Sequence, residues 1–228
     1  MRALRSFVRG AARIALGAAL VWSAVSALLA AFAYVMLRER YGRARAGPFS
    51  STHALQLLHP QRRWLYPVGT LLRLFRVRTG DTVLELGPGP GYFTIEAGRL
   101  VGAAGRVICV DVQPGMVSIL RQRLRDADAE NAHPVVGDAT RLPLSDGCVD
   151  VAFMVTVLGE IQDRPAALAE LRRVMKPGGV LSVMEGLGDP DYQLEASVRD
   201  LCRATGFREL DHQRQRLGYV LCFAAPGA

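Results

Sequence analysis

Cysteine is scarce in this chain and is not arranged as a disulfide framework. There are four cysteines among 228 residues, and no two of them have close paired spacing. This absence excludes a scaffold held together by disulfides and is consistent with a reducing compartment. We expect those that fall on predicted strands, Cys109 and Cys222, to be small buried apolar side chains. The other two are Cys148 and Cys202.

Histidine is equally scarce, and its four occurrences show no metal-ligand spacing. We therefore predict no structural or catalytic metal. The chain also lacks internal repeats, and its one biased tract is an alanine-rich segment near the N-terminus. The length fits one domain of about 150 residues with an N-terminal extension. The histidines are His53, His59, His133 and His212.

Acidic residues are nearly missing from the first eighty positions. Residues 1–80 contain thirteen arginines and a single acid, Glu39, whereas residues 81–228 carry fifteen basic and twenty acidic residues. The net charge of +7 therefore conceals a mildly acidic second part. Because nucleic-acid binding normally needs a basic domain face, we expect no nucleic-acid partner.

Charge is absent altogether between Ile14 and Leu37, a run of twenty-four residues. As a helix this run would be about 36 Å long, against a hydrocarbon core of about 30 Å. Trp22 and Tyr34 lie near its two ends, as interfacial aromatic residues do. We predict a transmembrane helix inside a basic-flanked anchor that spans residues 1–45.

Two other interpretations of this run stay open. A secretory signal peptide would explain the four preceding arginines and the cleavage-like sequence at residues 31–33. The run is longer than the usual apolar core of about 7–15 residues, and more arginines follow it at once. A buried or surface-lying helix is the other alternative. Arginines are equally numerous on the two flanks, so local charge does not set an orientation.

A glycine turn follows a short apolar strand in the second part of the chain. Residues 83–86 are typical of a buried strand, and the pattern E-x-G-x-G-x-G covers residues 85–91. Alternating glycines let the backbone turn sharply and admit a ligand close to its amide groups. The dinucleotide fingerprint requires a further glycine where Tyr92 stands. The carboxylate of Glu85 disfavours a phosphate and favours a cofactor with a cationic amino group.

Two more acids close predicted strands. Residues 106–111 end in Asp111, twenty positions after Gly91, which is the spacing of a carboxylate that reaches ribose hydroxyls. Residues 134–137 precede Asp138 in the same way. Each acid taken alone also fits the cap of a following helix. Three acids in register with three strands indicate a shared binding site.

These motifs together resemble those of class I S-adenosylmethionine-dependent methyltransferases, in particular the small-molecule, quinone-methylase-like branch. Residues 147–158 look like the fourth strand of that family. Residues 171–183 look like its helix, Pro-Gly-Gly turn and fifth strand, the turn ending the helix because proline cannot continue it. The resemblance covers roughly residues 60 to 225.

The alternation of strand and helix signals predicts an α/β fold. Parallel strands need long crossovers, so we expect a Rossmann-like, doubly wound, mainly parallel sheet, which the resemblance implies has seven strands and an antiparallel last strand. Residues 206–210 and 218–224 are too close in sequence for a crossover helix and should form a hairpin. Before this domain, residues 81–228, we place a linker and helical lid at residues 46–80. Helices are expected at 91–102, 114–128, 163–175 and 193–204.

The resemblance implies S-adenosyl-L-methionine as the cofactor and gives each motif residue a role. Glu85 would bind the amino end of the cofactor or a nearby water, Asp111 the ribose, and Asp138 the adenine amino group. The first two glycines would pass under the amino acid tail, and Val112 and Ala139 would pack beside adenine. The predicted cofactor residues are Glu85, Gly87, Gly89, Gly91, Asp111, Val112, Asp138 and Ala139.

A general base is not evident in the sequence. Glu160 stands where many relatives in this family carry histidines, which puts any inherited acceptor chemistry in doubt. Other acids and a tyrosine follow the predicted fifth strand, and the linker adds polar and aromatic residues. The residues that follow the strands fit a helix cap or a solvated loop equally well, and the linker residues, which could face the acceptor, could instead dock the anchor onto the domain. The candidates are Glu160, Glu185, Asp189 and Tyr192, and from the linker His59, Arg62, Trp64 and Tyr66.

The sequence thus predicts a membrane-anchored methyltransferase that acts on a small hydrophobic or membrane-borne acceptor, such as a quinone precursor or a lipid headgroup. The family's need for a cytosolic cofactor pool favours a cytoplasmic domain. A non-catalytic cofactor-binding or scaffold protein is the alternative, and a nicotinamide-dependent enzyme is disfavoured by Tyr92. The methylated atom and the oligomeric state stay open.

Overall fold

The computed structural model describes residues 22–23, 25–27, 54, 57–59, 62 and 66–227. The chain divides into two compact units, Met1–Arg45 and Ala46–Ala228. In the first unit the described residues are helical and exposed, and the rest of the predicted transmembrane helix lies outside the described residues. Among the helices that the structure does describe, none has the length and apolar character needed to cross a membrane.

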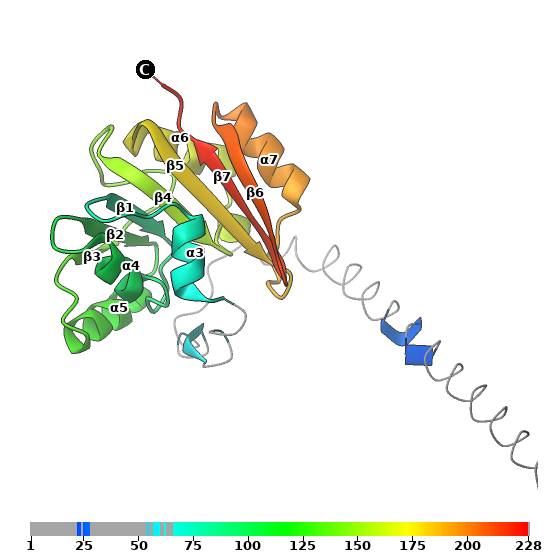
Figure 1. The fold of residues 1–228 in the computed structure, drawn as a ribbon, viewed down its shortest axis with the longest axis horizontal. Coiled ribbons are helices and arrows are strands. Elements are labelled where there is room, and N and C mark those ends of the chain that lie inside the picture. The colour runs from blue at the N-terminus through cyan, green and yellow to red at the C-terminus, as the bar shows by residue number, and fades with distance from the viewer. Residues whose placement is uncertain are drawn as a thin grey trace, which may run out of the picture. The chain divides into compact units, whose positions relative to one another are not determined.

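The second unit is built on a seven-stranded sheet with the order β3-β2-β1-β4-β5-β7-β6 (Figure 1). β7 runs antiparallel to both of its neighbours, and the other pairings are parallel. The predicted mainly parallel sheet with an antiparallel last strand is therefore confirmed. The strands are β1 Thr82–Leu86, β2 Arg106–Asp111, β3 Ala132–Val136, β4 Val149–Val155, β5 Met175–Gly186, β6 Arg208–Gln215 and β7 Gly218–Ala224.

Helices cover both faces of this sheet because its strands alternate apolar residues between two cores. In β1, Leu84 and Leu86 belong to one buried cluster, whereas Val83 belongs to the other. The first cluster contains buried residues of α6 and α7, and the second those of α3, α4 and α5. The helices are α3 Val68–Leu74, α4 Thr94–Val101, α5 Pro114–Asp126, α6 Arg164–Val174 and α7 Glu195–Ala204.

The helix nearest the glycine turn starts later than the sequence predicts. α4 begins at Thr94 rather than at residue 91, and the intervening residues form a turn. Gly91 has φ 82°, a left-handed conformation that cannot belong to a right-handed helix. The loop between β1 and α4 is therefore three residues longer than predicted.

Two strands, β5 and β6, differ in ways that bear on the predicted turn and connection. β5 starts at Met175, so the Pro-Gly-Gly sequence lies within its span, but the pairing with β4 is interrupted between Met175 and Val180. Gly178 at this interruption has φ 74°, so the predicted turn is present as an irregularity of the strand. β6 extends to Gln215, through polar residues predicted as a connection, because an edge strand can leave one side in water.

The segment before β1 is anchored to the sheet by α3. The Ser182 hydroxyl of β5 donates to the carbonyl of Phe75 at 3.3 Å, and the Phe75 ring stacks on Phe153 with centroids 5.1 Å apart. Both aromatic side chains are fully buried. Cys109 and Cys222 are buried on strands, as predicted. α3 is thus part of the fold of the second unit.

Candidate functional site

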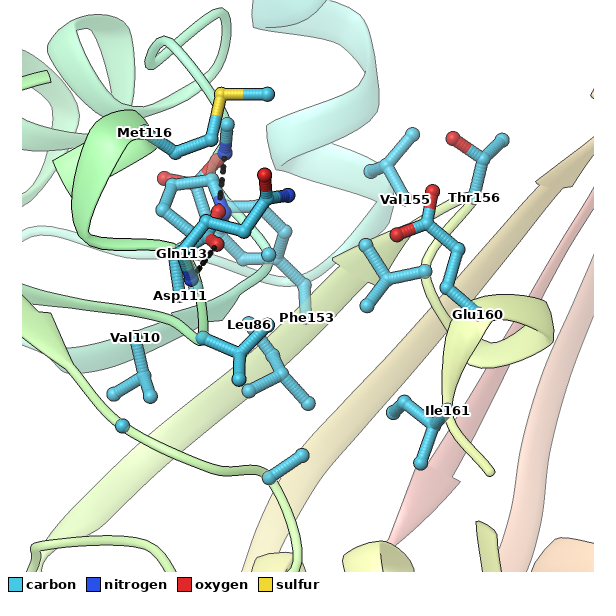
Figure 2. Close-up of a pocket in the computed structure, with 18 of the residues that line it drawn as sticks. Leu86, Val110, Asp111, Gln113, Met116, Phe153, Val155, Thr156, Glu160 and Ile161 are labelled. Carbon is cyan, nitrogen blue, oxygen red and sulfur yellow. Dashed lines mark hydrogen bonds between the residues drawn. The ribbon is translucent and has the colours of Figure 1, made fainter. Parts of the chain in front are cut away.

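A cavity of about 470 Å³ lies at the carboxyl edge of the central strands. We call one wall the cofactor side, because it holds predicted cofactor residues. We call the other the acceptor side, because it holds residues predicted to face an acceptor. Figure 2 shows Asp111, Gln113 and Met116 on the first side and Thr156 and Glu160 on the second. The main groups are Glu85, Gly87, Gly89, Asp111 and Asp138 on the cofactor side, and Arg62, Thr156, Glu160 and Asp189 on the acceptor side.

The glycine loop of the cofactor side has no room for side chains. Gly87 and Gly91 have φ values of 66° and 82°. A Cβ on Gly87 would lie 2.4 Å from Val157 Cγ2, and one on Gly91 would lie 2.4 Å from Leu120 Cδ1. Gly87 thus brings the backbone against the β4 edge, while Gly91 packs the start of the α4 turn on α5. Backbone, rather than side chains, forms this part of the wall.

Asp111 holds the glycine loop to the tip of β2. Its Oδ2 accepts the Gly89 N–H at 3.2 Å, and its Oδ1 accepts the Gln113 N–H at 2.9 Å. Burial raises the pKa of Asp111, while these two backbone donors lower it. Each oxygen has a second lone pair, so the carboxylate can still accept hydrogen bonds from a ligand diol in the cavity.

Glu85 is a fully enclosed carboxyl group beneath the loop. Its Oε2 accepts the Thr94 hydroxyl at 2.6 Å. Burial raises the pKa of Glu85 to about 8, the charge of Asp111 adds to this rise, and the Thr94 hydrogen bond opposes it. A cationic group bound in the cavity near Glu85 would favour the ionised form.

Asp138 lies at the exposed end of the cofactor side. Its Oδ1 accepts both the backbone N–H and the hydroxyl of Thr140, each at 2.8 Å, and these bonds lower its pKa. The residue therefore closes a local turn as well as lining the cavity. Ala139 and Val112 line the cavity beside it.

The acceptor side is centred on Arg62. Its guanidinium lies over the rings of Tyr66 and Tyr92, with 5.2 Å to each ring centroid. The Tyr92 hydroxyl donates to the backbone carbonyl of Tyr66 at 3.0 Å, which holds the Tyr92 ring against this segment. The Nε of Arg62 is buried and has no hydrogen-bond partner among the described residues, and burial lowers the pKa of the guanidinium. Arg62 thus brings a partly desolvated cation to the cavity lining.

Asp189 and Thr156 complete this side. Thr156, just after β4, has φ 54°, a left-handed conformation that is costly for a β-branched residue. Its N–H donates to Met184 O at 2.8 Å, and its hydroxyl bonds the carboxylate of Asp189. Burial raises the pKa of Asp189, whereas Thr156 and the charge of Arg62 lower it. Backbone strain thus orients a hydroxyl toward a half-buried carboxylate in the cavity.

Most of the predicted site residues reach this cavity, and some do not. Of the eight predicted cofactor residues, Gly91 is the one that does not line it; the others are on the cofactor side. Glu160, Arg62 and Asp189 line the acceptor side. His59 is exposed, and neither His59 nor Tyr192 lines the cavity. Trp64 lies outside the described residues.

Tyr192, Tyr66 and Glu185 have structural neighbours instead. The Tyr192 ring makes an edge contact with Tyr219, with centroids 5.9 Å apart. Tyr66 packs under Arg62, and Glu185 Oε2 accepts the Gln193 N–H at 3.2 Å. In the described part of the chain, no group of three or more histidine, cysteine, aspartate or glutamate residues could hold a metal ion.

Sequence reasoning missed Thr156 and Gln113, both of which line the cavity. Gln113 follows Asp111 by two residues, so its position beyond the β2 tip was a usable signal. The left-handed backbone of Thr156 has no sequence signal, because threonine is not a residue expected at positive φ.

The central part of this domain is similar in sequence to known proteins. Residues 83–179 match a family model described as a methyltransferase domain. A ubiquinone/menaquinone biosynthesis C-methyltransferase of Vibrio vulnificus is 38% identical over 109 residues, 47% of this chain and 42% of the relative. The corresponding protein of Shewanella halifaxensis is 34% identical over 125 residues, 54% of this chain and 49% of the relative. The chain thus spans less than half the length of these curated relatives.

Solved structures share the fold more widely. An S-adenosylmethionine-dependent methyltransferase from Aquifex aeolicus has a TM-score of 0.75 at 24% identity, covering 78% of this chain and 99% of the other. The [4+2]-cyclase SpnF has a TM-score of 0.63 at 20% identity, covering 71% of this chain and 80% of the other. At these identities the likeness concerns the fold alone, and the second structure bears the name of a different reaction.

Proposed function

We propose that the chain is a class I S-adenosyl-L-methionine-dependent methyltransferase and that it transfers the cofactor's methyl group to a small acceptor. The observation that carries this proposal is the two-sided cavity. Its cofactor side gathers three strand tips that close at Glu85, Asp111 and Asp138, and its acceptor side adds further polar groups. A site that only bound a cofactor would not need the second wall.

The cofactor side suits S-adenosyl-L-methionine better than a dinucleotide. The pattern has Tyr92 where a phosphate-binding loop needs glycine, and Glu85 would repel a pyrophosphate. We assign Glu85 to the cationic amino end, Gly87 and Gly89 to the amino acid tail, and Asp111 to the ribose. Because Gly87 and Gly89 carry no side chain, the cofactor can approach the backbone closely here.

When bound, the cofactor supplies an electrophilic methyl group on a sulfonium. The residues of the chain then align the acceptor for direct displacement and exclude water. Asp189, half-buried and oriented by Thr156, is placed to take the proton that a hydroxyl or carbon acceptor must lose. Arg62 lines the same cavity, and its guanidinium charge attracts an acceptor oxygen.

We propose a hydrophobic or membrane-borne acceptor. The relatives named above are quinone C-methyltransferases, which supports this class for the present chain. The uncharged run Ile14–Leu37 supports a single-pass membrane anchor, and the family's need for a cytosolic cofactor pool favours a domain on the cytoplasmic side. Within that run, the described residues are helical, and Trp22 exposes 72% of its surface. A tether raises the concentration of the active site near a bilayer-dissolved acceptor.

The experiment is a transfer assay with methyl-labelled S-adenosyl-L-methionine and the full-length protein in lipid nanodiscs. A lipid extract and a soluble metabolite extract are offered separately, and the labelled product is identified by mass spectrometry. Label in a lipid-extract product that is absent from an Asp111→Ala control supports the proposal. If calorimetry shows cofactor binding but no product carries label, the non-catalytic scaffold is favoured. If the protein binds NAD and not S-adenosyl-L-methionine, the cofactor assignment is wrong.

A further inference from the structure

The large apolar side chains that the described part of the domain exposes gather at one edge of the sheet. Val112 follows β2, Val136 ends β3, Leu187 follows β5, Leu194 precedes α7, and Leu217 lies in the β6–β7 turn. Parallel strands end at one edge, and the turn of the antiparallel β7 returns to it. All five, exposed by 49%, 44%, 50%, 60% and 44% in that order, therefore lie at the carboxyl edge.

These side chains stand on both sides of the cavity mouth. Val112 lines the cavity, and Val136 is the ladder partner of Asp111 beside it. On the far side of the sheet, the Leu187 N–H donates to the Leu217 carbonyl at 3.0 Å, so these two leucines are neighbours at the tip of β5 and β7. In Figure 1 this tip is where the β6–β7 turn meets the end of β5. We call the five residues the apolar rim.

The opposite edge of the sheet has a different surface. Its exposed residues in the described chain include Arg78, Arg106 and Lys176 and no large apolar side chain. Single exposed apolar residues need no explanation, and the proposed adenine would cover part of Val112. The other four at the same edge, around the cavity mouth, indicate an interaction surface.

The chain enters the domain at this same edge. Leu57 and Arg62, which precede α3, both line the cavity, and Leu57 Cδ1 would lie 3.4 Å from a Cβ on Gly89. Residues 38–53 separate this entry from the uncharged run and can span at most roughly 55 Å. If the run is in a bilayer, the apolar rim is therefore within reach of that bilayer.

The charges at the rim decide which lipid surface fits. Exposed Asp138 and Asp163 lie at the same edge as exposed Arg214 and Arg216, so the edge has no single sign. Such a surface does not select anionic headgroups, and its contact with a membrane must rest on apolar insertion at the interface.

We propose that the apolar rim inserts into the surface of the lipid bilayer and holds the cavity mouth against it. A membrane-borne acceptor then passes from the lipid into the acceptor side without crossing water. This inference rests on the proposed membrane-anchored function and adds the face of the domain that meets the lipid.

The test measures depth, not activity. Full-length protein carrying Leu217→Cys is labelled with an environment-sensitive fluorophore and reconstituted in phosphatidylcholine nanodiscs with and without nitroxide-labelled lipid. Cys148→Ser is added, because the other three cysteines, all described by the structure, are buried. The matched control is Arg78→Cys at the opposite edge. We expect a blue shift and at least threefold stronger lipid quenching for the Leu217 position than for the Arg78 position.

A second variant distinguishes insertion of the apolar rim into the lipid from mere closeness of the label to the bilayer. Leu187→Asp beside the label should reduce the quenching at least twofold, whereas Thr79→Asp at the opposite edge should leave it unchanged. Equal quenching at both labelled positions overturns the proposal, as does failure of the chain to remain with the nanodiscs. A blue shift without lipid quenching would mean that a second copy covers the rim and would overturn it as well.

The same samples report on the proposed function independently. Calorimetric titration with S-adenosylhomocysteine measures the cofactor side, which neither the rim variants nor the labels touch. Loss of that binding with intact lipid quenching would remove the proposed function and leave the lipid contact. Intact S-adenosylhomocysteine binding without lipid quenching would overturn the lipid contact and leave the proposed function standing.

Discussion

The two sides of the cavity are built by different means. The cofactor side is formed by consecutive strand tips, and its groups are fixed by backbone geometry: glycines at positive φ and a carboxylate that accepts two backbone N–H groups. The acceptor side takes Arg62, Thr156 and Asp189 from three distant segments, and it leaves a buried Nε without a hydrogen bond. A ligand that is the same in every family member, such as the cofactor, can be recognised by backbone groups. A ligand that differs between members, such as the acceptor, must be recognised by side chains.

The family match follows this division only in part. Residues 83–179 include every predicted cofactor residue, and on the acceptor side they include Thr156 and Glu160 but not Arg62 or Asp189. The cofactor side thus lies wholly within the matched range, whereas the acceptor side extends beyond it. If the two sides bind different ligands, mutations on them should have separable effects on cofactor affinity and on turnover.

The largest effect is expected from Glu85, because the cofactor side encloses its carboxyl group. Its pKa in the folded chain is about 8, above the ordinary value of 4.5, so the folded state keeps a proton that the unfolded state has lost between these pH values. Stability from this group is present below pH 4.5 and is lost as pH rises toward 8, by at most about 1.4 kcal/mol per pH unit.

Urea unfolding of the cofactor-free protein at pH 5, 6.5 and 8 measures this slope. Glu85→Gln should flatten it, while Glu96→Gln, an exposed position on α4, should not. Cofactor binding should release a proton near pH 7, seen in calorimetry as a dependence on buffer ionisation enthalpy. A wild-type slope equal to that of Glu85→Gln would contradict the assignment.

Asp111→Ala should weaken cofactor binding without changing the fold. It removes a charged acceptor for the ribose and frees the glycine loop, so we expect about 100-fold weaker cofactor binding, roughly 2.7 kcal/mol. Asp200→Ala, an exposed aspartate on α7, is the control. Calorimetry measures affinity, and circular dichroism checks the fold. Unchanged affinity in Asp111→Ala would remove the ribose assignment.

Asp189→Asn tests the acceptor side and should lower turnover rather than cofactor affinity. We expect kcat to fall about 30-fold, within the usual range for loss of a general base, with cofactor affinity unchanged. Burial raises the pKa of Asp189, so the wild-type rate should fall with acidity at a higher pH than for an ordinary aspartate. That limb should vanish in the variant. Asp200→Asn, at an exposed position on α7, is the matched control, and an equal loss of rate in both would mean a structural role.

Thr156 should give the smallest effect. Thr156→Gly relieves the strained φ of 54° but removes the hydroxyl that bonds Asp189. We expect stability to change by less than about 1 kcal/mol and kcat to fall about fivefold. Thr156→Ser keeps the hydroxyl and should retain most of the rate. A Ser variant as slow as the Gly variant would show that Thr156 does not position Asp189.

The sequence was sufficient for the sheet and the cofactor side because their signals are local. Each motif acid follows its own strand, and Gly87 and Gly89 are adjacent to Glu85 in sequence. Parallel pairing then brings separate strand tips to one edge without further information. The assignment of these residues to parts of the cofactor stays a prediction that the variants above address.

The acceptor side could not be predicted in the same way because its neighbours are distant in sequence. Arg62 stands beside Tyr92, thirty positions away, only because α3 packs on the sheet. Thr156 adopts a backbone conformation that its residue type disfavours. The end of β6 was also misjudged, since polar residues at an edge strand look like a loop when the partner strand is unknown.

The entry segment, in which Leu57 and Arg62 form part of the cavity wall, sets limits on how this protein can change in length. With the membrane anchor proposed above, insertions before residue 54 would alter the length of chain between that anchor and the domain. Insertions between residues 57 and 66 would move Arg62 off its two aromatic rings and alter the pocket. Natural variants of this chain should therefore vary in spacing upstream of that boundary and keep a constant spacing downstream of it.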